Sequence, residues 1–231
     1  YIEAAVAPQP CRSIATTLKN SAGYRTAFFQ SAKGSFEARP GLVHNLGFDN
    51  FFARDDIADS NTYLGYLAAD EFALLQPIED WIKESPQPFL LTVLCSATHD
   101  PYEIPEHYID NEINNDSEPY ERYCRVIEYT DSFIEELYKM ISSQIDNDNL
   151  IFCVVGDHGE AFGQHSRFGH ARIPYDEATR VFWIITGDKI KKKKIDLPVS
   201  NLDVTPTILS ILGFDVSSAS FDGINVLQKN P

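Results

Sequence analysis

Short apolar runs, bounded by proline, glycine and polar residues, recur along the chain and predict the strands of a sheet. Phe89–Ala97 and Leu150–Val155 have the length and apolar content of strands that are buried on both faces. Arg25–Gln30 and Val181–Thr186 are further strand candidates. The chain therefore carries strands in its first, middle and last thirds.

Other segments repeat their apolar residues at the three- and four-residue spacing of an amphipathic helix. Glu118–Ile145 has the clearest stripe, and Thr62–Glu84 has a second one, which Pro77 should split or kink. Ser13–Asn20 and Asn201–Leu212 are shorter helix candidates. Strands alternating with helices predict an α/β fold, with a mostly parallel sheet and helices on both faces.

Composition narrows the class of protein. A chain of 231 residues with 43% hydrophobic and 12% aromatic residues is typical of one globular domain, and we expect a single domain over residues 1–231. The net charge of −15 argues against nucleic acid as a partner. Because the chain begins at Tyr1 and Met140 is its only methionine, we expect it to be truncated at its N-terminus.

Two polar residues with metal-binding chemistry follow the run Leu150–Val155. Asp157 and His158 come directly after Gly156, and the carboxyl ends of parallel strands are where open α/β sheets form their ligand crevice. A carboxylate and an imidazole suit Mn²⁺, Zn²⁺ or, with more oxygen ligands, Ca²⁺. The alternative is a solvated turn with a hydrogen-bonded histidine, which is the commoner role of such a dipeptide.

A histidine stands in the same position after another strand. His99 follows Phe89–Ala97 by two residues, and neighbouring parallel strands bring their carboxyl ends to one edge of the sheet. We therefore expect His99 to lie beside Asp157 and His158. The alternative is a histidine whose hydrogen bonds are satisfied locally at the strand end.

The order of motifs in the last third resembles a known family. Val155–Glu160 (VGDHGE), Gly163–His165, Gly169-His170 and Tyr175–Val181 (YDEATRV) are similar to the metal motif of the sulfatase-like branch of the alkaline phosphatase superfamily. That branch includes arylsulfatases, phosphonate monoester hydrolases, phosphoethanolamine transferases and lipoteichoic acid synthases. Phe182 departs from the pattern, because the family usually has proline there.

The resemblance extends over almost the whole chain and implies an alkaline-phosphatase-like sandwich. In the first third, Ser35–Arg39 followed by Leu46–Asp49 is closer to the lipoteichoic acid synthases, and the GKWH-like signature of arylsulfatases is missing.

The resemblance also implies roles for individual residues. Asp157 and His158 are expected to hold a divalent metal (Ca²⁺, Mn²⁺ or Zn²⁺), and Glu160 to orient one of the ligands. His99 and His170 are expected to be catalytic and to contact the substrate oxyanion or leaving group. His165 is a weaker candidate for substrate binding.

The nucleophile of the family has no counterpart in this chain. Sulfatases use cysteine or serine in C/S-x-P-x-R, but Cys11 is followed by Ser13 and Ala15 at the proline and arginine positions. The resemblance places the nucleophile and the first acidic metal ligand upstream of Tyr1. We therefore expect the chain as given to bind metal weakly and to turn over esters poorly or not at all.

Three functions remain open. The first is a metal-dependent hydrolase of sulfate esters, and the second is a phosphoethanolamine or phosphoglycerol transferase, which His170 in place of a lysine favours. The third is a catalytically inactive binding module. The expected partner is a sulfated or phosphorylated small molecule, glycan or lipid, with membrane association of the parent protein. Relatives mostly act outside the cytoplasm, so a periplasmic, extracellular or membrane-anchored domain is expected.

Overall fold

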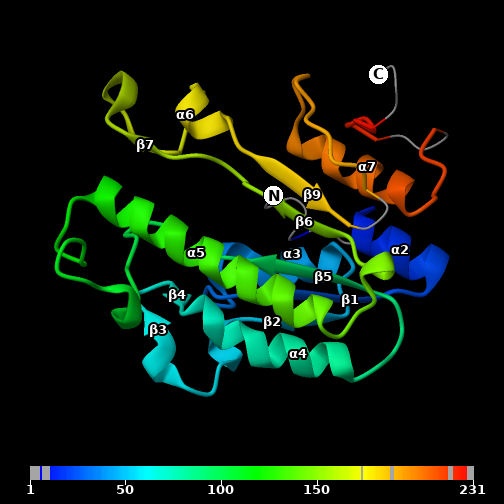
Figure 1. Ribbon diagram of the computed structural model, residues 1–231, viewed down its shortest axis with the longest axis horizontal. Coiled ribbons are helices and arrows are strands. Elements are labelled where there is room, and N and C mark those ends of the chain that lie inside the picture. The colour runs from blue at the N-terminus through cyan, green and yellow to red at the C-terminus, as the bar shows by residue number, and fades with distance from the viewer. Residues whose placement is uncertain (1–5, 7–10, 173, 188–189, 218–220, 228–231) are drawn as a thin grey trace. The chain divides into compact units, whose positions relative to one another are not determined.

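The computed structural model describes residue 6 and residues 11–172, 174–187, 190–217 and 221–227 (Figure 1). The chain divides into two compact units, Tyr1–Gln144 and Ile145–Pro231, and each is described by itself below. The expectation of a single domain stays a prediction. No helix in the described part of the chain is both long and apolar enough to cross a membrane.

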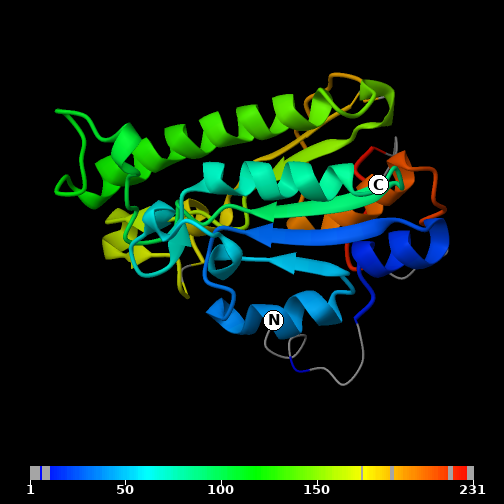
Figure 2. The same cartoon turned by 90° about the horizontal axis from the view of Figure 1, so that it is seen from below.

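A parallel sheet organises the first unit. Its strands β1 (Arg25–Gln30), β2 (Asn50–Phe52) and β5 (Phe89–Leu94) lie in the order β2-β1-β5, and their arrows point the same way in Figure 2. Arg25 pairs with Phe89 and Gln30 with Leu94, so β1 and β5 run in full register. The predicted strand Phe89–Ala97 is thus confirmed as far as Leu94. Its residues are half-buried, which corrects the expectation that both faces are buried.

The prediction of one helix over Thr62–Glu84 was wrong in its first half. A short antiparallel pair, β3 (Tyr63–Leu64) and β4 (Ala68–Ala69), occupies that stretch, and Gly65 in the turn has a φ of +49°. The helix α4 spans only Leu75–Lys83. Pro77 therefore lies in its first turn, where the missing N–H has no helical acceptor, and it causes no break.

The other helices of the first unit follow their sequence signals. α2 (Ile14–Ala22) begins after the capping residue Ser13 and ends at Gly23, whose φ of 69° is left-handed. α5 (Pro119–Ser142) confirms the long predicted helix, and α4 packs against it. Its buried stripe consists of Val126, Tyr129, Thr130, Phe133, Leu137 and Ile141. The remaining elements are α3 (Arg39–Asn45) and the 3-10 helices 36–38, 54–56, 60–62, 71–74 and 106–108.

The second unit is built on two antiparallel pairs. β6 (Phe152–Val155) pairs with β9 (Trp183–Thr186), and β7 (Ala161–Phe162) with β8 (Phe168–Gly169). Two expectations for Leu150–Val155 were wrong, because its pairing with Val181–Thr186 is antiparallel and Val155 is 40% exposed. A strand in an antiparallel pair can still be apolar throughout, so the run did not reveal its pairing.

Two helices complete the second unit. α6 (Asp176–Thr179) forms part of the YDEATRV motif, and α7 (Val204–Ile211) confirms the last predicted helix with Pro206 in its first turn. Three-residue 3-10 helices lie at 147–149, 164–166 and 201–203. Asp203 stands at the N-cap position of α7, and its side chain accepts the N–H groups of Ser200 and Ile224.

Candidate functional site

The segment that carries Asp157 and His158 is fixed by backbone contacts on both sides. β6 ends at Val155, and the Gly156 N–H still donates to the Phe182 carbonyl at 3.1 Å. The side chain of Asn201 donates to the Gly156 carbonyl at 3.0 Å, and the Gly159 N–H donates to the Ala178 carbonyl at 2.8 Å. The strand end is thus held to β9, to α6 and to the start of the last helical segment.

Gly159 is required by close packing. A Cβ at this position would lie 2.2 Å from the carbonyl oxygen of Glu177 in α6, well inside van der Waals contact. The glycine of the DHGE motif therefore allows α6 to approach the turn that carries Asp157 and His158.

Asp157 and His158 present neighbouring donor atoms. Asp157 Oδ2 lies 3.6 Å from His158 Nε2, and Asp157 Oδ1 accepts the His158 N–H at 2.8 Å. The imidazole Nδ1 lies 2.8 Å from the Gly159 carbonyl oxygen, which can only accept, so Nδ1 carries a proton. In the neutral ring Nε2 is then the basic nitrogen, on the side of the Asp157 carboxylate.

The β7–β8 hairpin brings His170 to His158. Ala161 pairs with Gly169 in the antiparallel hairpin, so Glu160 and His170 lie opposite each other at the next position. His170 Nδ1 is 3.1 Å from Glu160 Oε2, and the His170 ring stacks on His158 with centroids 3.9 Å apart. The Glu160 side chain is only 6% exposed, and its Oε1 has no hydrogen-bond partner among the described residues.

His165 belongs to a separate cluster in the same unit. Its Nδ1 lies 2.8 Å from Glu177 Oε1, and its ring stacks on Tyr175 with centroids 4.0 Å apart. The backbone of His165 is left-handed, with a φ of 50°. Hydrogen bonding from His165 lowers the pKa of Glu177, which keeps that carboxylate ionised as an acceptor for the imidazole.

The donor atoms of this unit fit a divalent metal. One carboxylate oxygen and one imidazole nitrogen, both on exposed side chains and 3.6 Å apart, match the ligand types of Zn²⁺ and Mn²⁺. Within the described residues, no group of three or more His, Cys, Asp or Glu side chains is placed to hold an ion. The described set is therefore a pair of ligands.

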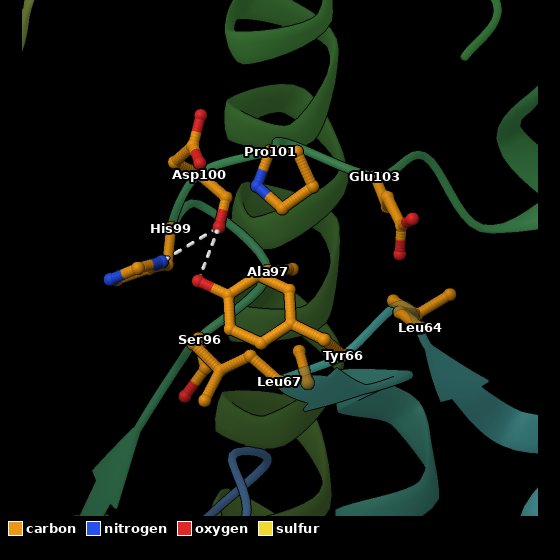
Figure 3. A pocket seen from close by; sticks show the side chains of 10 residues that line it. Leu64, Tyr66, Leu67, Ser96, Ala97, His99, Asp100, Pro101 and Glu103 are labelled. Atoms are coloured by element: carbon orange, nitrogen blue, oxygen red, sulfur yellow. Dashed lines mark hydrogen bonds between the residues drawn. The ribbon is translucent and has the colours of Figure 1, made fainter. Parts of the chain in front are cut away.

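His99 lies in the turn that follows β5 in the first unit. The His99 N–H donates to the Ser96 carbonyl, and the Tyr102 N–H donates to the His99 carbonyl, both at 3.0 Å. His99 Nδ1 lies 2.8 Å from the Asp100 carbonyl oxygen, which also accepts the Tyr66 hydroxyl at 3.3 Å (Figure 3). His99 lines a small pocket together with Tyr66, Leu67, Ser96, Pro101 and Glu103.

The predicted site residues thus fall into three groups. Asp157, His158 and His170 are in contact with one another, whereas His165 contacts Tyr175 and Glu177 instead. His99 belongs to the other unit, and its place beside Asp157 and His158 stays a prediction. Sequence reasoning missed the contacts of Glu177 and Asn201, because nothing in residue type or spacing marks such partners.

A family model described as Sulfatase matches residues 3–214. The chain belongs to the sulfatase family. Its α/β fold with a parallel sheet is shared with solved members of the alkaline phosphatase superfamily, which confirms the predicted fold class.

Two curated relatives differ in how much of the chain they match. Lipoteichoic acid synthase 2 of Bacillus subtilis is 26% identical over 94% of this chain and 35% of that protein. Human N-acetylglucosamine-6-sulfatase is 30% identical over 42% of this chain and 18% of that protein. The chain therefore spans about a third, or less, of the length of these curated relatives.

A solved structure matches nearly the whole chain. The crystal structure of the lipoteichoic acid synthase LtaP from Listeria monocytogenes has a TM-score of 0.75 and covers 98% of this chain and 59% of that chain. Its sequence identity is 17%, so this likeness concerns the fold.

Proposed function

We propose that this chain supplies the metal-binding and substrate-binding residues of a metal-dependent phosphodiester enzyme, a phosphoglycerol or phosphoethanolamine transferase. One observation carries the proposal. Asp157 Oδ2 and His158 Nε2 lie 3.6 Å apart, and the ring of His170 stacks on His158 at 3.9 Å. A metal-ligand pair and an imidazole able to move a proton thus occupy one surface of the second unit.

The residues have complementary tasks in such a reaction. Asp157 and His158 would hold the metal, which when bound supplies a Lewis acid for the ester oxygens and a means of activating a nucleophile. His170 has the proton on Nδ1 held by Glu160, so when the ring is protonated its Nε2 can donate to the departing ester oxygen, and when the ring is neutral Nε2 can accept the proton of an attacking hydroxyl. His99 offers its Nε2 in the same way from the first unit, because Nδ1 is held by the Asp100 carbonyl.

Two observations favour phosphate over sulfate. The lipoteichoic acid synthase relative matches 94% of the chain, whereas the N-acetylglucosamine-6-sulfatase relative matches 42%. In addition, His170 occupies a position where many sulfatases carry lysine, and an imidazole can change its charge as the leaving group departs.

Hydrolysis of sulfate esters is the second candidate function. The family model that matches residues 3–214 is described as Sulfatase, and the human N-acetylglucosamine-6-sulfatase segment is 30% identical. Both functions use the same metal ligands, so the substrate distinguishes them. A third outcome, an inactive binding module, would retain ligand binding without turnover.

Metal binding by this chain is the first test. We expect Mn²⁺ or Zn²⁺ to bind weakly in calorimetry, and Asp157→Asn or His158→Ala to lower the affinity a further 10-fold or more because each removes one of two described ligands. The matched controls are Asp196→Asn and His44→Ala, on exposed residues outside this cluster. Equal affinity in all five proteins would overturn the metal assignment.

Substrate choice is the second test. The full-length protein should cleave bis-p-nitrophenyl phosphate faster than p-nitrophenyl sulfate, with the loss of both activities in Asp157→Asn. The reverse preference would favour the sulfate esterase. Metal binding without either activity would favour the binding module.

The proposed partner is a phosphorylated glycan or lipid headgroup. We place the domain on the outer side of the cytoplasmic membrane, anchored through its parent protein. Fractionation of cells, with protease treatment of protoplasts or spheroplasts followed by detection of the domain, tests this location. Protection of the domain until the cytoplasmic membrane is broken would contradict it.

A further inference from the structure

The carboxyl group of Glu71 lies buried where β1 and β5 end, and the proposed function does not use it. Its residue is 0% exposed. Oε1 accepts the Ser31 hydroxyl at 2.8 Å and the backbone N–H groups of Ser96 at 2.6 Å and Ala97 at 2.9 Å. Ser31 directly follows β1, and Ser96 and Ala97 lie just beyond β5, so one oxygen ties two neighbouring strand ends together.

The hydrogen bonds of Glu71 are linked to His99 through one residue, Ser96. Glu71 holds the N–H of Ser96, and the carbonyl of Ser96 accepts the N–H of His99 at 3.0 Å. The labelled residues Ser96, Ala97, His99 and Asp100 form one continuous turn in Figure 3. A shift of Ser96 would therefore move the backbone from which the imidazole of His99 projects.

We propose that Glu71 is a positioning residue for His99, acting by clamping the turn that begins at Ser96. The inference rests on the proposed role of His99 in the ester reaction. Glu71 itself touches neither the substrate nor the reacting atoms in this scheme.

Burying a carboxylate to make structural hydrogen bonds is unfavourable, because its charged form loses hydration. Burial raises the pKa of Glu71 to about 7, against the opposing effect of the hydrogen bonds from Ala97, Ser31 and Ser96. Its Oε2 has no hydrogen-bond partner among the described residues. Hydrogen bonds to an ionised acceptor are about twice as strong as neutral ones, so the clamp tightens when Glu71 loses its proton.

Other titratable groups lie near Glu71, and their ionisation must be distinguished from that of Glu71. Asp70 is adjacent, the Tyr129 hydroxyl accepts the Glu71 N–H and donates to Asp70, and Cys95 lies within electrostatic range. Burial raises the pKa of Tyr129 and of Cys95, so both stay neutral around pH 7. His107 Nδ1 lies 3.7 Å from Asp70 Oδ2, and a His107→Gln variant removes its contribution.

Histidine and amide NMR spectra of this chain give a test that needs no turnover. In the wild type we expect the Ser96 and Ala97 amide shifts to titrate with a midpoint near pH 7, and the neutral His99 ring to carry its proton on Nδ1. Glu71→Gln should abolish the amide titration, and Glu71→Ala should give a mixture of His99 tautomers. His107→Gln should leave both wild-type signals unchanged.

A control is needed to show that a loss of stability alone does not change the His99 tautomer. Leu137→Ala, which removes a buried side chain from α5, should lower the melting temperature without changing the His99 tautomer. If Glu71→Ala fails to fold, Glu71→Gln and the amide titration still decide. Amide shifts of Ser96 and Ala97 that titrate in Glu71→Gln as in the wild type would overturn the proposal, as would a folded Glu71→Ala with an unchanged His99 tautomer.

Kinetics add a second, independent readout. In the full-length protein with bis-p-nitrophenyl phosphate, Glu71→Ala should lower kcat about 10- to 100-fold with little change in KM. In Glu71→Gln, the change of kcat with pH near pH 7 should disappear. If neither the wild type nor any variant turns over the ester, the proposed function is wrong. The NMR result still tests the role of Glu71 in that case.

Discussion

Four histidines share one arrangement at the scale of single residues. In each of them Nδ1 faces an oxygen that acts as an acceptor, which places the proton on Nδ1 and makes Nε2 the basic nitrogen. For His99 and His158 the acceptor is a backbone carbonyl of the next residue. For His165 and His170 it is a carboxylate twelve or ten residues away, and residue type alone did not predict these pairs.

Glu160 gives the first residue-scale prediction. Glu160→Gln replaces the acceptor of His170 with an amide that can also donate, so the Nδ1 proton is less firmly held. We expect kcat on a phosphodiester to fall about 10- to 100-fold with KM nearly unchanged. The matched control is Glu112→Gln, on an exposed residue, which should have wild-type kinetics. A wild-type kcat in Glu160→Gln would remove this carboxylate from the mechanism.

Glu71 gives a prediction about stability. Its pKa of about 7 in the folded chain exceeds its ordinary value of 4.5, so its contribution to folding is complete below pH 4.5 and is lost as the pH rises through 7. From pH 5 to pH 8 the free energy of unfolding should fall by about 2–3 kcal/mol relative to Glu71→Gln. Urea denaturation of both proteins at the two pH values measures this. A constant difference between them would contradict a raised pKa.

At the scale of elements, the sequence predicted those helices whose ends and faces depend on neighbouring residues. The caps at Ser13 and Gly23 and the stripe of α5 depend on neighbouring residues, and these helices formed as predicted. Thr62–Glu84 failed because its apolar spacing also suits the tight β3–β4 turn, in which Gly65 adopts a left-handed backbone. The antiparallel pairing of β6 with β9 depends on contacts across the chain, which apolar runs do not encode.

Gly159 gives the prediction at this scale. Gly159→Ala places a Cβ 2.2 Å from the Glu177 carbonyl oxygen, so α6 must move away from the turn of Asp157 and His158. We expect about 2–3 kcal/mol of destabilisation and weaker metal binding. Gly23→Ala is the control, because its φ of +69° carries a cost of about 1–2 kcal/mol but nothing lies within 4 Å. Similar stability losses in the two variants, with metal affinity retained in Gly159→Ala, would refute the close approach as a determinant of the site.

At the scale of the whole molecule, the candidate site was predicted unevenly. The positions of Asp157, His158 and His170 followed from motif order, and the structure brings these three into contact. Glu160 was expected to orient a metal ligand, and the β7–β8 hairpin places it on His170, whereas Glu177 lies near His165 only because of the position of α6. Such long-range placement is a property of the folded chain, so the sequence identified the reactive groups better than their supports.

The last prediction concerns the placing of His99, which the motif argument expects beside Asp157 and His158. Mn²⁺ is paramagnetic and broadens the NMR signals of nearby nuclei, and Asp157 and His158 are the ligands expected to hold it. Substoichiometric Mn²⁺ should therefore broaden the imidazole signals of His99 together with those of His158 and His170, while His44 and His107 stay sharp. Asp157→Asn should remove the broadening from all of them, because the ion is no longer held. If the His99 signal stays as sharp as that of His107 while His158 is broadened, His99 does not lie near the metal. The reaction centre in the described residues would then consist of Asp157, His158 and His170.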